Sequence, residues 1–250
     1  MPSQSFSGIF PLYKYRGETL AVLLDRFRSE HSLDHTAKLT YAGRLDPMAE
    51  GLVLVLAGED RFRKDMLLDL PKTYRVEVLL GIGTDTLDPL GRITTMSPRE
   101  VSSADIEGAV SRMTAITTLP YPMYSSVPVD GKPLFVHARA GESVEVPLKN
   151  VSIYSVHIES IRTESMSTLA TSVVRDIERV VGDFRQAEII EDWTKLVSST
   201  DTGVIVTLSI SCSSGTYMRS LAQWLGQELG VPAIAYSIER TSLGKYSLPK

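Results

Sequence analysis

The sequence predicts an α+β fold in which helices flank a mixed, mostly antiparallel central sheet, and three observations support this prediction. Strand-type alternation and helix-type spacing both recur, but without the regular strand–helix–strand order of a doubly wound fold. Of the 250 residues, 43% are hydrophobic and 22% are charged, which is the composition of a packed protein. The apolar residues are spread along the chain without a linker or repeat, so residues 1–250 are expected to form one domain.

The first half of the chain begins with Gly8–Lys14, which indicates a loop or a strand. A helix pattern then runs from Thr19, whose hydroxyl can cap it, to about Glu30. Residues 51–57 form an apolar run bounded by glycines, which is typical of a buried strand. The other predicted elements of this half are a polar loop at 31–44, a helix at 60–70, a strand at 73–80, turns at 81–91 and a helix at 102–113 capped by Ser102 or Ser103.

The second half begins with residues 117–135, whose prolines and aromatics predict an extended excursion. Residues 204–212 alternate strongly, with apolar side chains at every second position, and therefore predict a strand. The other predicted elements are strands at 144–146 and 151–161, a charged helix pair at 172–196 broken near Gly182, a helix at 216–229 that Gly230 and Pro232 end and Thr216 helps to cap, and a strand-like stretch at 233–248.

Charge neither indicates nor excludes an RNA substrate. The net charge is −4, but residues 150–202 alone hold nine acidic and five basic residues, so the rest of the chain is neutral. The single cysteine, Cys212, allows no internal disulfide, which fits a cytoplasmic location. The longest apolar run, at 52–57, is far shorter than the roughly 20 residues that span a bilayer, so neither a membrane association nor a signal peptide is expected.

Two short motifs carry possible chemistry, although each alone has a simpler structural explanation. Asp46 lies in Gly-Arg-Leu-Asp-Pro, directly before a buried strand, where a carboxylate can serve as a nucleophile or a base. In isolation, a solvated turn is the more common role for such an aspartate. Tyr74, between Lys72 and Arg75, can stack on a base while its neighbours hold phosphates, but it also suits an ordinary strand.

Three further features of the sequence have structural explanations or leave alternatives open. The glycine-rich turn at 81–91 has neither the lysine of a P-loop nor the spacing of a calcium loop, and His31 and His35 have no further ligands for zinc, so no metal site is expected. Cys212 belongs to the alternating strand and is expected in the core. Arg219 lies in the first turn of a helix, against the helix dipole, which leaves two alternatives: a specific anionic partner or exposure to solvent.

Taken together and in order, these segments resemble the TruB family of tRNA pseudouridine synthases. The resemblance extends from Gly8 to about Leu248. The matching segments are 43–51 (Gly-Arg-Leu-Asp-Pro-Met-Ala-Glu-Gly), 72–91, 124–141, 212–230 and 240–246.

The resemblance implies a pseudouridine synthase fold and the isomerisation of uridine to pseudouridine in the T loop of tRNA, at the position called 55, with no metal or organic cofactor. It implies that Asp46 is the catalytic carboxylate, that Arg219 pairs with it, and that Tyr74 packs against the flipped base and can take the C5 proton. Attack at the sugar carbon, attack on the ring and deprotonation of the sugar are all open to the carboxylate. The other residues implied in substrate or RNA binding are Lys14, Tyr41, Arg44, Lys72, Tyr124, Lys132, Arg139 and Ile238.

The chain also departs from the family pattern. Tyr41 stands where the family has a histidine associated with base flipping, and Ser214 stands where a lysine is common, which removes one RNA-facing cation. Residues 117–142 match the segment that grips the RNA, whereas the acidic stretch at about 165–200 is predicted to be a helical insertion. A C-terminal PUA domain is not expected, and the family suggests a monomer.

The sequence also allows functions other than tRNA pseudouridine synthesis. One keeps the chemistry but changes the substrate to ribosomal RNA or another tRNA loop. Another is a non-catalytic RNA-binding protein or tRNA-folding chaperone, which is disfavoured because Asp46, Tyr74 and Arg219 are all present. In a further interpretation, the acidic insertion is a docking surface for a protein partner.

Overall fold

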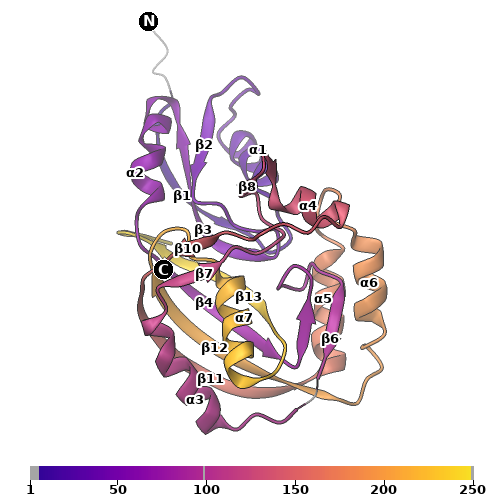
Figure 1. Cartoon of the computed structure of the whole chain (residues 1–250). Coiled ribbons are helices and arrows are strands. Elements are labelled where there is room, and N and C mark those ends of the chain that lie inside the picture. Colours follow the sequence, from indigo (N-terminus) through magenta and orange to yellow (C-terminus); the bar gives the residue numbers. More distant parts are fainter. Residues whose placement is uncertain (1–5, 98, 249–250) are drawn as a thin grey trace, which may run out of the picture.

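A computed structural model describes residues 6–97 and 99–248, and its centre is one eight-stranded sheet (Figure 1). The strand order is β1-β3-β13-β4-β12-β11, with β2 paired to β3 and β14 paired to β13. Every pair is antiparallel except β3–β13, which confirms the mixed, mostly antiparallel sheet. The strands are β1 (Gly8–Lys14), β2 (Leu39–Ala42), β3 (Ala49–Ala57), β4 (Lys72–Leu80), β11 (Ile153–Ser165), β12 (Thr202–Cys212), β13 (Ala233–Leu243) and β14 (Tyr246–Ser247).

Three two-stranded sheets and seven α-helices complete the described part of the chain. The small sheets pair β5 with β6, β7 with β10 and β8 with β9. Their strands are β5 (Ile82–Thr84), β6 (Ile93–Met96), β7 (Thr118–Pro120), β8 (Pro128–Val129), β9 (Lys132–Pro133) and β10 (Leu148–Asn150). The helices are α1 (Leu20–Glu30), α2 (Lys64–Leu68), α3 (Ser103–Arg112), α4 (Leu134–Ala140), α5 (Met166–Ile177), α6 (Gln186–Thr194) and α7 (Met218–Leu229), with short 3₁₀ turns at Gly58–Arg63 and Met113–Ala115.

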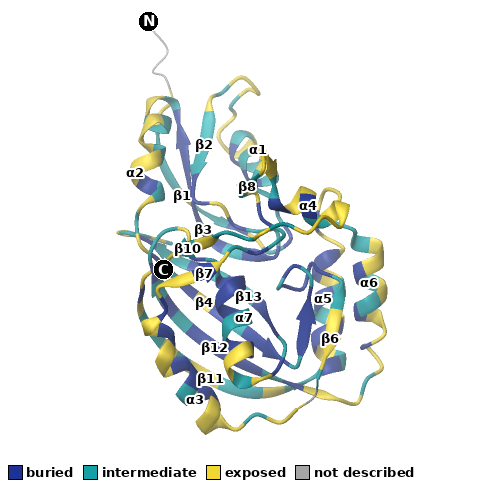
Figure 2. Ribbon diagram, viewed as in Figure 1, coloured by how far each residue is buried: buried dark blue, intermediate teal, exposed yellow. Residues whose placement is uncertain are grey.

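Alternation along the strands divides the core between the faces of the sheet (Figure 2). Val76 and Val78 of β4 belong to the core cluster that includes buried side chains of α1, α3 and α7. Leu79 of the same strand belongs to the cluster formed with α5 and α6. Trp193 of α6 is fully buried there, and its indole N–H donates to the Pro89 carbonyl at 3.1 Å. The acidic insertion is therefore packed against the sheet by an apolar face.

Most of the predicted elements are present, and Thr19 and Ser102 cap their helices as expected. The exceptions depend on contacts that are distant in sequence. The expected loop at 31–44 contains β2, which forms because β3 supplies a partner. Residues 144–146 form no strand, and β7 pairs instead with β10. Thr216 does not cap α7, because Tyr217 holds the cap position without a side-chain bond.

Candidate active site

The loop that carries Asp46 connects β2 to β3, and the side chain of Arg240 on β13 holds its shape. Arg240 is buried and donates hydrogen bonds to three carbonyls, those of Leu52 (2.7 Å), Gly43 (3.0 Å) and Arg44 (3.2 Å). Gly43 has a φ of +80°, and a Cβ at that position would lie 3.1 Å from the guanidinium. A glycine is therefore needed for the arginine to approach the loop this closely.

Lys14 supports the other side of the same loop. It is fully buried at the end of β1, and its ammonium donates to the carbonyls of Ala49 (2.6 Å), Pro47 (3.2 Å) and Tyr15 (3.2 Å). Burial lowers its pKa to about 8. The sequence led us to expect Lys14 at the substrate, whereas the geometry makes it a donor to the backbone around Asp46.

Asp46 and Arg219 meet although they are 173 residues apart in the sequence. The Nε atom of Arg219 lies 2.8 Å from Oδ2 of Asp46 and 3.9 Å from Oδ2 of Asp88. The arginine side chain is 3% exposed and that of Asp46 36% exposed, so the carboxylate is the member of the pair that faces solvent. Of the two alternatives for Arg219, the specific anionic partner is confirmed.

The turn that follows β5 binds the Arg219 guanidinium through a backbone carbonyl. Nη1 of Arg219 donates to the Thr86 carbonyl at 2.9 Å, and both terminal nitrogens approach the Tyr124 carbonyl at 3.2 and 3.3 Å. The Asp88 carboxylate folds the turn by accepting from the Thr86 hydroxyl at 2.7 Å and from the Leu90 amide at 2.9 Å. Burial opposes the charge of Arg219, but the carboxylates of Asp46 and Asp88 outweigh it and raise the pKa of the guanidinium.

Tyr74 lies on β4 opposite Arg240 of β13 and is 7% exposed. Burial raises the pKa of its phenol, although the nearby charge of Arg240 acts in the opposite direction. The phenol therefore keeps its proton at neutral pH. Lys72, two residues earlier, is also buried and donates to the carbonyls of Leu68 (2.7 Å) and Leu70 (2.6 Å), and burial lowers its pKa to about 8.

A cavity of about 810 Å³ opens over these groups, which is large enough for a nucleotide. Nine of the eleven residues expected at the site line it: Asp46, Tyr74, Arg219, Tyr41, Arg44, Lys72, Tyr124, Arg139 and Ile238. Lys14 and Lys132 do not, and Lys132 is exposed and lies 3.7 Å from Glu142. Among the described residues, no three His, Cys, Asp or Glu side chains are grouped as a metal site would require.

Comparison with known proteins identifies the family. The family described as TruB family pseudouridylate synthase (N terminal domain) matches residues 31–177, which is more than half of the chain. The chain belongs to the TruB family. A protein of Listeria innocua named tRNA pseudouridine synthase B is 33% identical over 95% of the chain, and the chain spans 66% of that relative's length. A Bordetella avium protein of the same name is 32% identical over 95% of the chain, which spans 86% of it.

Solved structures agree on the fold. The Cbf5-Nop10-Gar1 complex includes a chain that superposes with a TM-score of 0.60 at 17% identity, over 98% of this chain and 51% of that one. A chain of the archaeal box H/ACA sRNP Nop10-Cbf5 complex superposes with a TM-score of 0.56 at 16% identity, over 97% of this chain and 49% of that one. Within the residues described, no helix is long and apolar enough to cross a membrane.

Three polar residues of this TruB-family site were not assigned a role from the sequence: Asp88, Arg185 and Arg240. Asp88 and Arg240 lie in segments that resemble the family, and the alternation of β13 places Arg240 on the same strand face as Ile238. That pattern was a usable signal for a buried arginine. Arg185 lies in the insertion, where neither the resemblance nor the alternation gave a signal.

Proposed function

We propose that this protein is a tRNA pseudouridine synthase that isomerises uridine at position 55 of the T loop. Membership of the TruB family and the name shared by its relatives support this proposal. The observation that carries it is the ion pair between Asp46 and Arg219, which presents a half-exposed carboxylate to a cavity of nucleotide size. The monomeric state and the cytoplasmic location expected from the sequence belong to the same proposal.

The reaction is an isomerisation that a positioned carboxylate can promote without a further reactant. The N1–C1′ bond of uridine breaks, a C5–C1′ bond forms, and the proton on C5 is replaced by one on N1, so no atom is gained or lost. Neither an oxidant nor a group donor is required. Asp46 is the acidic group through which the protein would act on the nucleotide, and Arg219 stabilises its negative charge inside a partly desolvated pocket.

Tyr74 has a narrower role in this proposal than the resemblance implied. A phenol with a raised pKa is neutral and is a poor proton acceptor. The burial of Tyr74 at the cavity wall therefore favours packing against the uracil ring over removal of the C5 proton. Ile238, which is 7% exposed, adds an apolar contact to the same cavity.

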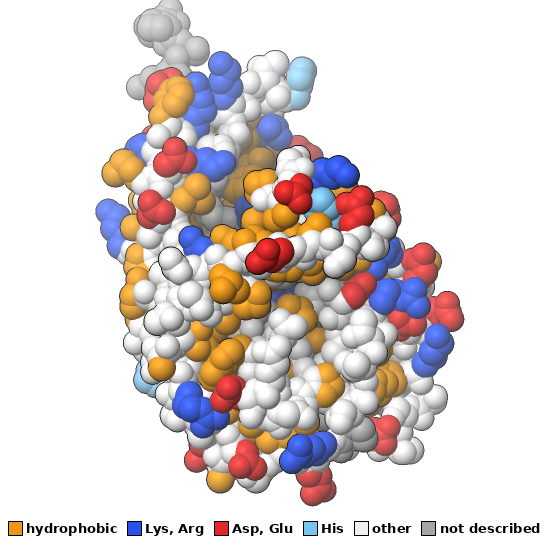
Figure 3. Space-filling view, in the orientation of Figure 1, with side chains coloured by type: hydrophobic (Ala, Val, Ile, Leu, Met, Phe, Trp, Pro, Cys, Tyr) orange, Lys and Arg blue, Asp and Glu red, His pale blue; other side chains and the backbone are white. Residues whose placement is uncertain are grey.

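The cavity suits a flipped nucleotide. A uridine inside a folded RNA loop must leave its stack before a side chain can reach it, at a cost of a few kcal/mol that stacking and phosphate contacts offset. Tyr41, Tyr124, Arg44 and Arg139 line the cavity and provide such contacts. Elsewhere, basic and acidic side chains alternate over the visible face (Figure 3), so a local binding site is compatible with a net charge of −4.

The direct test is tritium release from an unmodified tRNA transcript labelled at C5 of uridine. The wild-type protein should release tritium from this transcript. It should release none from a transcript in which only uridine 55 of the T loop is replaced by cytidine. Release that persists with the cytidine transcript would contradict the T-loop assignment and favour another tRNA loop. Absence of release from tRNA, together with release from ribosomal RNA, would favour the alternative substrate.

A further inference from the structure

The loop between α5 and α6 reaches the substrate cavity. Asp183, Phe184 and Arg185 all line the cavity, although they belong to the acidic insertion. The insertion is fixed on both sides: Arg16 pairs with Asp176 of α5 at 2.9 Å, and Nη2 of Arg92 donates to Asp192 of α6 at 3.2 Å. With Trp193 buried beneath them, the two helices hold the loop in a defined place on the sheet.

The loop itself is organised by the side chain of Gln186. Its amide nitrogen donates to the carbonyls of Gly182 (2.6 Å) and Val180 (3.1 Å), and its oxygen accepts from the Phe184 amide at 2.9 Å. Arg185 adopts a left-handed conformation with a φ of +62°, which is uncommon for an arginine. The surrounding contacts therefore direct the Arg185 side chain toward the cavity.

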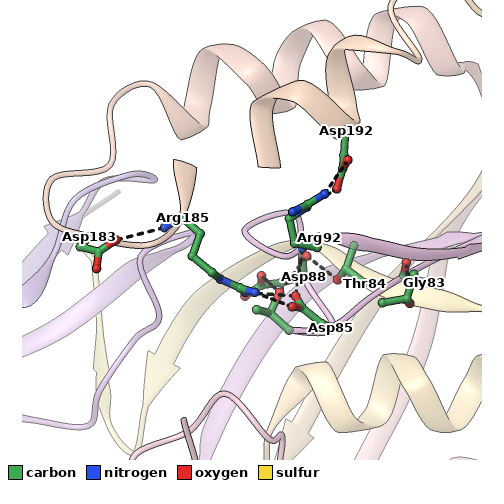
Figure 4. A network of polar contacts seen from close by, with 10 residues as sticks. Gly83, Thr84, Asp85, Asp88, Arg92, Asp183, Arg185 and Asp192 are labelled. Carbon is green, nitrogen blue, oxygen red and sulfur yellow. Dashed lines mark hydrogen bonds and ion pairs between the residues drawn. The ribbon is translucent and has the colours of Figure 1, made fainter. Parts of the chain in front are cut away.

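The guanidinium of Arg185 joins two functional segments, and Figure 4 shows its contact with the first of them, at Asp85. It donates two hydrogen bonds to the Asp85 carboxylate, at 2.7 and 3.2 Å, and Asp85 lies in the turn whose Thr86 carbonyl binds Arg219. It also lies over the ring of Tyr124, with 4.5 Å between Cζ and the ring centroid. Tyr124 is thus held at its carbonyl by Arg219 and at its ring by Arg185.

A second contact ties the insertion to the RNA-gripping segment at 117–142. Nη2 of Arg139 donates to the Asp183 carbonyl at 2.7 Å, and Nη1 lies 3.5 Å from the Asp183 carboxylate. Tyr124 and Arg139 are two of the residues expected to contact RNA, and each has a partner among the three loop residues. Figure 1 shows α4 beside the ends of α5 and α6, in agreement with these contacts.

We propose that the loop 183–185 is a substrate-positioning element of the synthase site, in which Arg185 fixes Tyr124 on the cavity wall for the RNA strand beside the flipped uridine. The inference rests on the proposed RNA substrate. It assigns the insertion to substrate binding rather than to a protein partner. Arg185 acts through Tyr124, so its loss should weaken RNA binding while leaving the Asp46–Arg219 pair in place.

The test compares Arg185→Gln with Arg179→Gln, using tritium release from the labelled tRNA transcript. Arg179 belongs to the same insertion, its side chain is 65% exposed, and it does not line the cavity, so both variants remove one charge from one region. Arg185→Gln should raise KM about fivefold, the combined effect of one cation–π contact and one half-buried ion pair, with kcat within twofold. Arg179→Gln should change neither constant.

Two further variants separate positioning from general damage. Arg185→Lys keeps the positive charge over Tyr124, so its KM should lie close to that of the wild-type protein. In a Tyr124→Leu background, Arg185→Gln should have almost no additional effect on KM, because the partner is already absent. Thermal melting of each variant establishes folding, and if Arg185→Gln does not fold, Asp85→Asn weakens the ion pair that holds the Arg185 guanidinium over Tyr124.

Three results would overturn the inference: an equal rise of KM in both glutamine variants, a fall of kcat at unchanged KM, or no effect. The first result would mean that the positive charge of the insertion attracts RNA wherever on the insertion that charge lies. The second would mean that Arg185 acts on Asp46 through the turn that contains Asp85 and binds Arg219. If the wild-type protein releases no tritium from any RNA, the proposed function fails, and this inference fails with it. Wild-type turnover therefore distinguishes the two failures.

Discussion

Replacing Arg240 with methionine should destabilise the protein strongly, because three carbonyls, two of them in buried hydrogen bonds, would lose a donor. The guanidinium donates to Leu52, Gly43 and Arg44 over 2.7 to 3.2 Å, and its side chain is 1% exposed. A buried acceptor left without a partner costs about 1–3 kcal/mol, and the bonds to Leu52 and Gly43 are both buried. Because methionine fills most of the volume, we expect a loss of about 3–5 kcal/mol.

The assay is urea unfolding followed by tryptophan fluorescence, with Arg75→Gln as the control. Arg75 lies on β4 opposite Glu239, the residue before Arg240 on β13, but it is 43% exposed and pairs with Glu159 at the surface. Its loss should cost less than about 1 kcal/mol. If Arg240→Met lowers the free energy of unfolding by no more than the control does, the loop that carries Asp46 does not depend on this arginine, and the reasoning is refuted.

Two pH-dependent effects follow from buried cations. Burial lowers the pKa of Lys72 to about 8, against about 10.5 in the unfolded chain, so its charged form is disfavoured in the fold. The free energy of unfolding of the wild type relative to Lys72→Met should therefore rise between pH 8 and 10.5, and a constant difference would contradict this. The bond to the Val129 carbonyl and the contact with Glu142 raise the pKa of His137. The stabilisation that protonated His137 provides should be complete below pH 6.5 and should be lost as the pH rises through the raised pKa. Urea unfolding from pH 5 to 9 should therefore show a fall in the free energy of unfolding of the wild type that is absent in His137→Gln. If the free energy of unfolding depends on pH in the same way in both proteins, His137 does not contribute this effect.

The sequence predicted the polar pair at the centre of the site better than its surroundings. An arginine in the first turn of a helix opposes the helix dipole, and this signalled a partner for Arg219. Which carboxylate it meets depends on how β12, α7 and the β2–β3 loop assemble, which spacing along the chain does not show. The resemblance to the family supplied Asp46, and the structure confirms the contact.

The lysines show why the surroundings were harder to predict. Both lysines were predicted to bind substrate, Lys14 from the resemblance to the family and Lys72 from its position beside Tyr74, whereas both are buried. Lys14 is the last residue of β1 and Lys72 the first residue of β4, and each ammonium donates to carbonyls that converge on it. Arg240 likewise donates to three carbonyls. Such groupings of carbonyls exist only after the sheet has formed, so the alternation of β13 can indicate that Arg240 is buried but not which groups it binds.

The insertion was predicted in outline only. Its helices, the break near Gly182 and its acidic charge are evident from the sequence, and α5 and α6 confirm the helix pair. The contact between Arg185 and Tyr124 joins positions 61 residues apart through two separate elements. It follows from the burial of Trp193, which orients the hairpin on the sheet and brings its loop to the cavity.

The central claim is that Asp46 performs the isomerisation, and Asp46→Asn tests it most directly. The substitution keeps the size of the side chain and removes its negative charge, so the cavity and the contacts of Arg219 with Thr86 and Tyr124 should persist. We predict that Asp46→Asn binds the tRNA transcript with wild-type affinity in a fluorescence anisotropy titration and releases no tritium from C5, while the wild-type protein releases it. Tritium release by Asp46→Asn at a rate near that of the wild type would contradict the account.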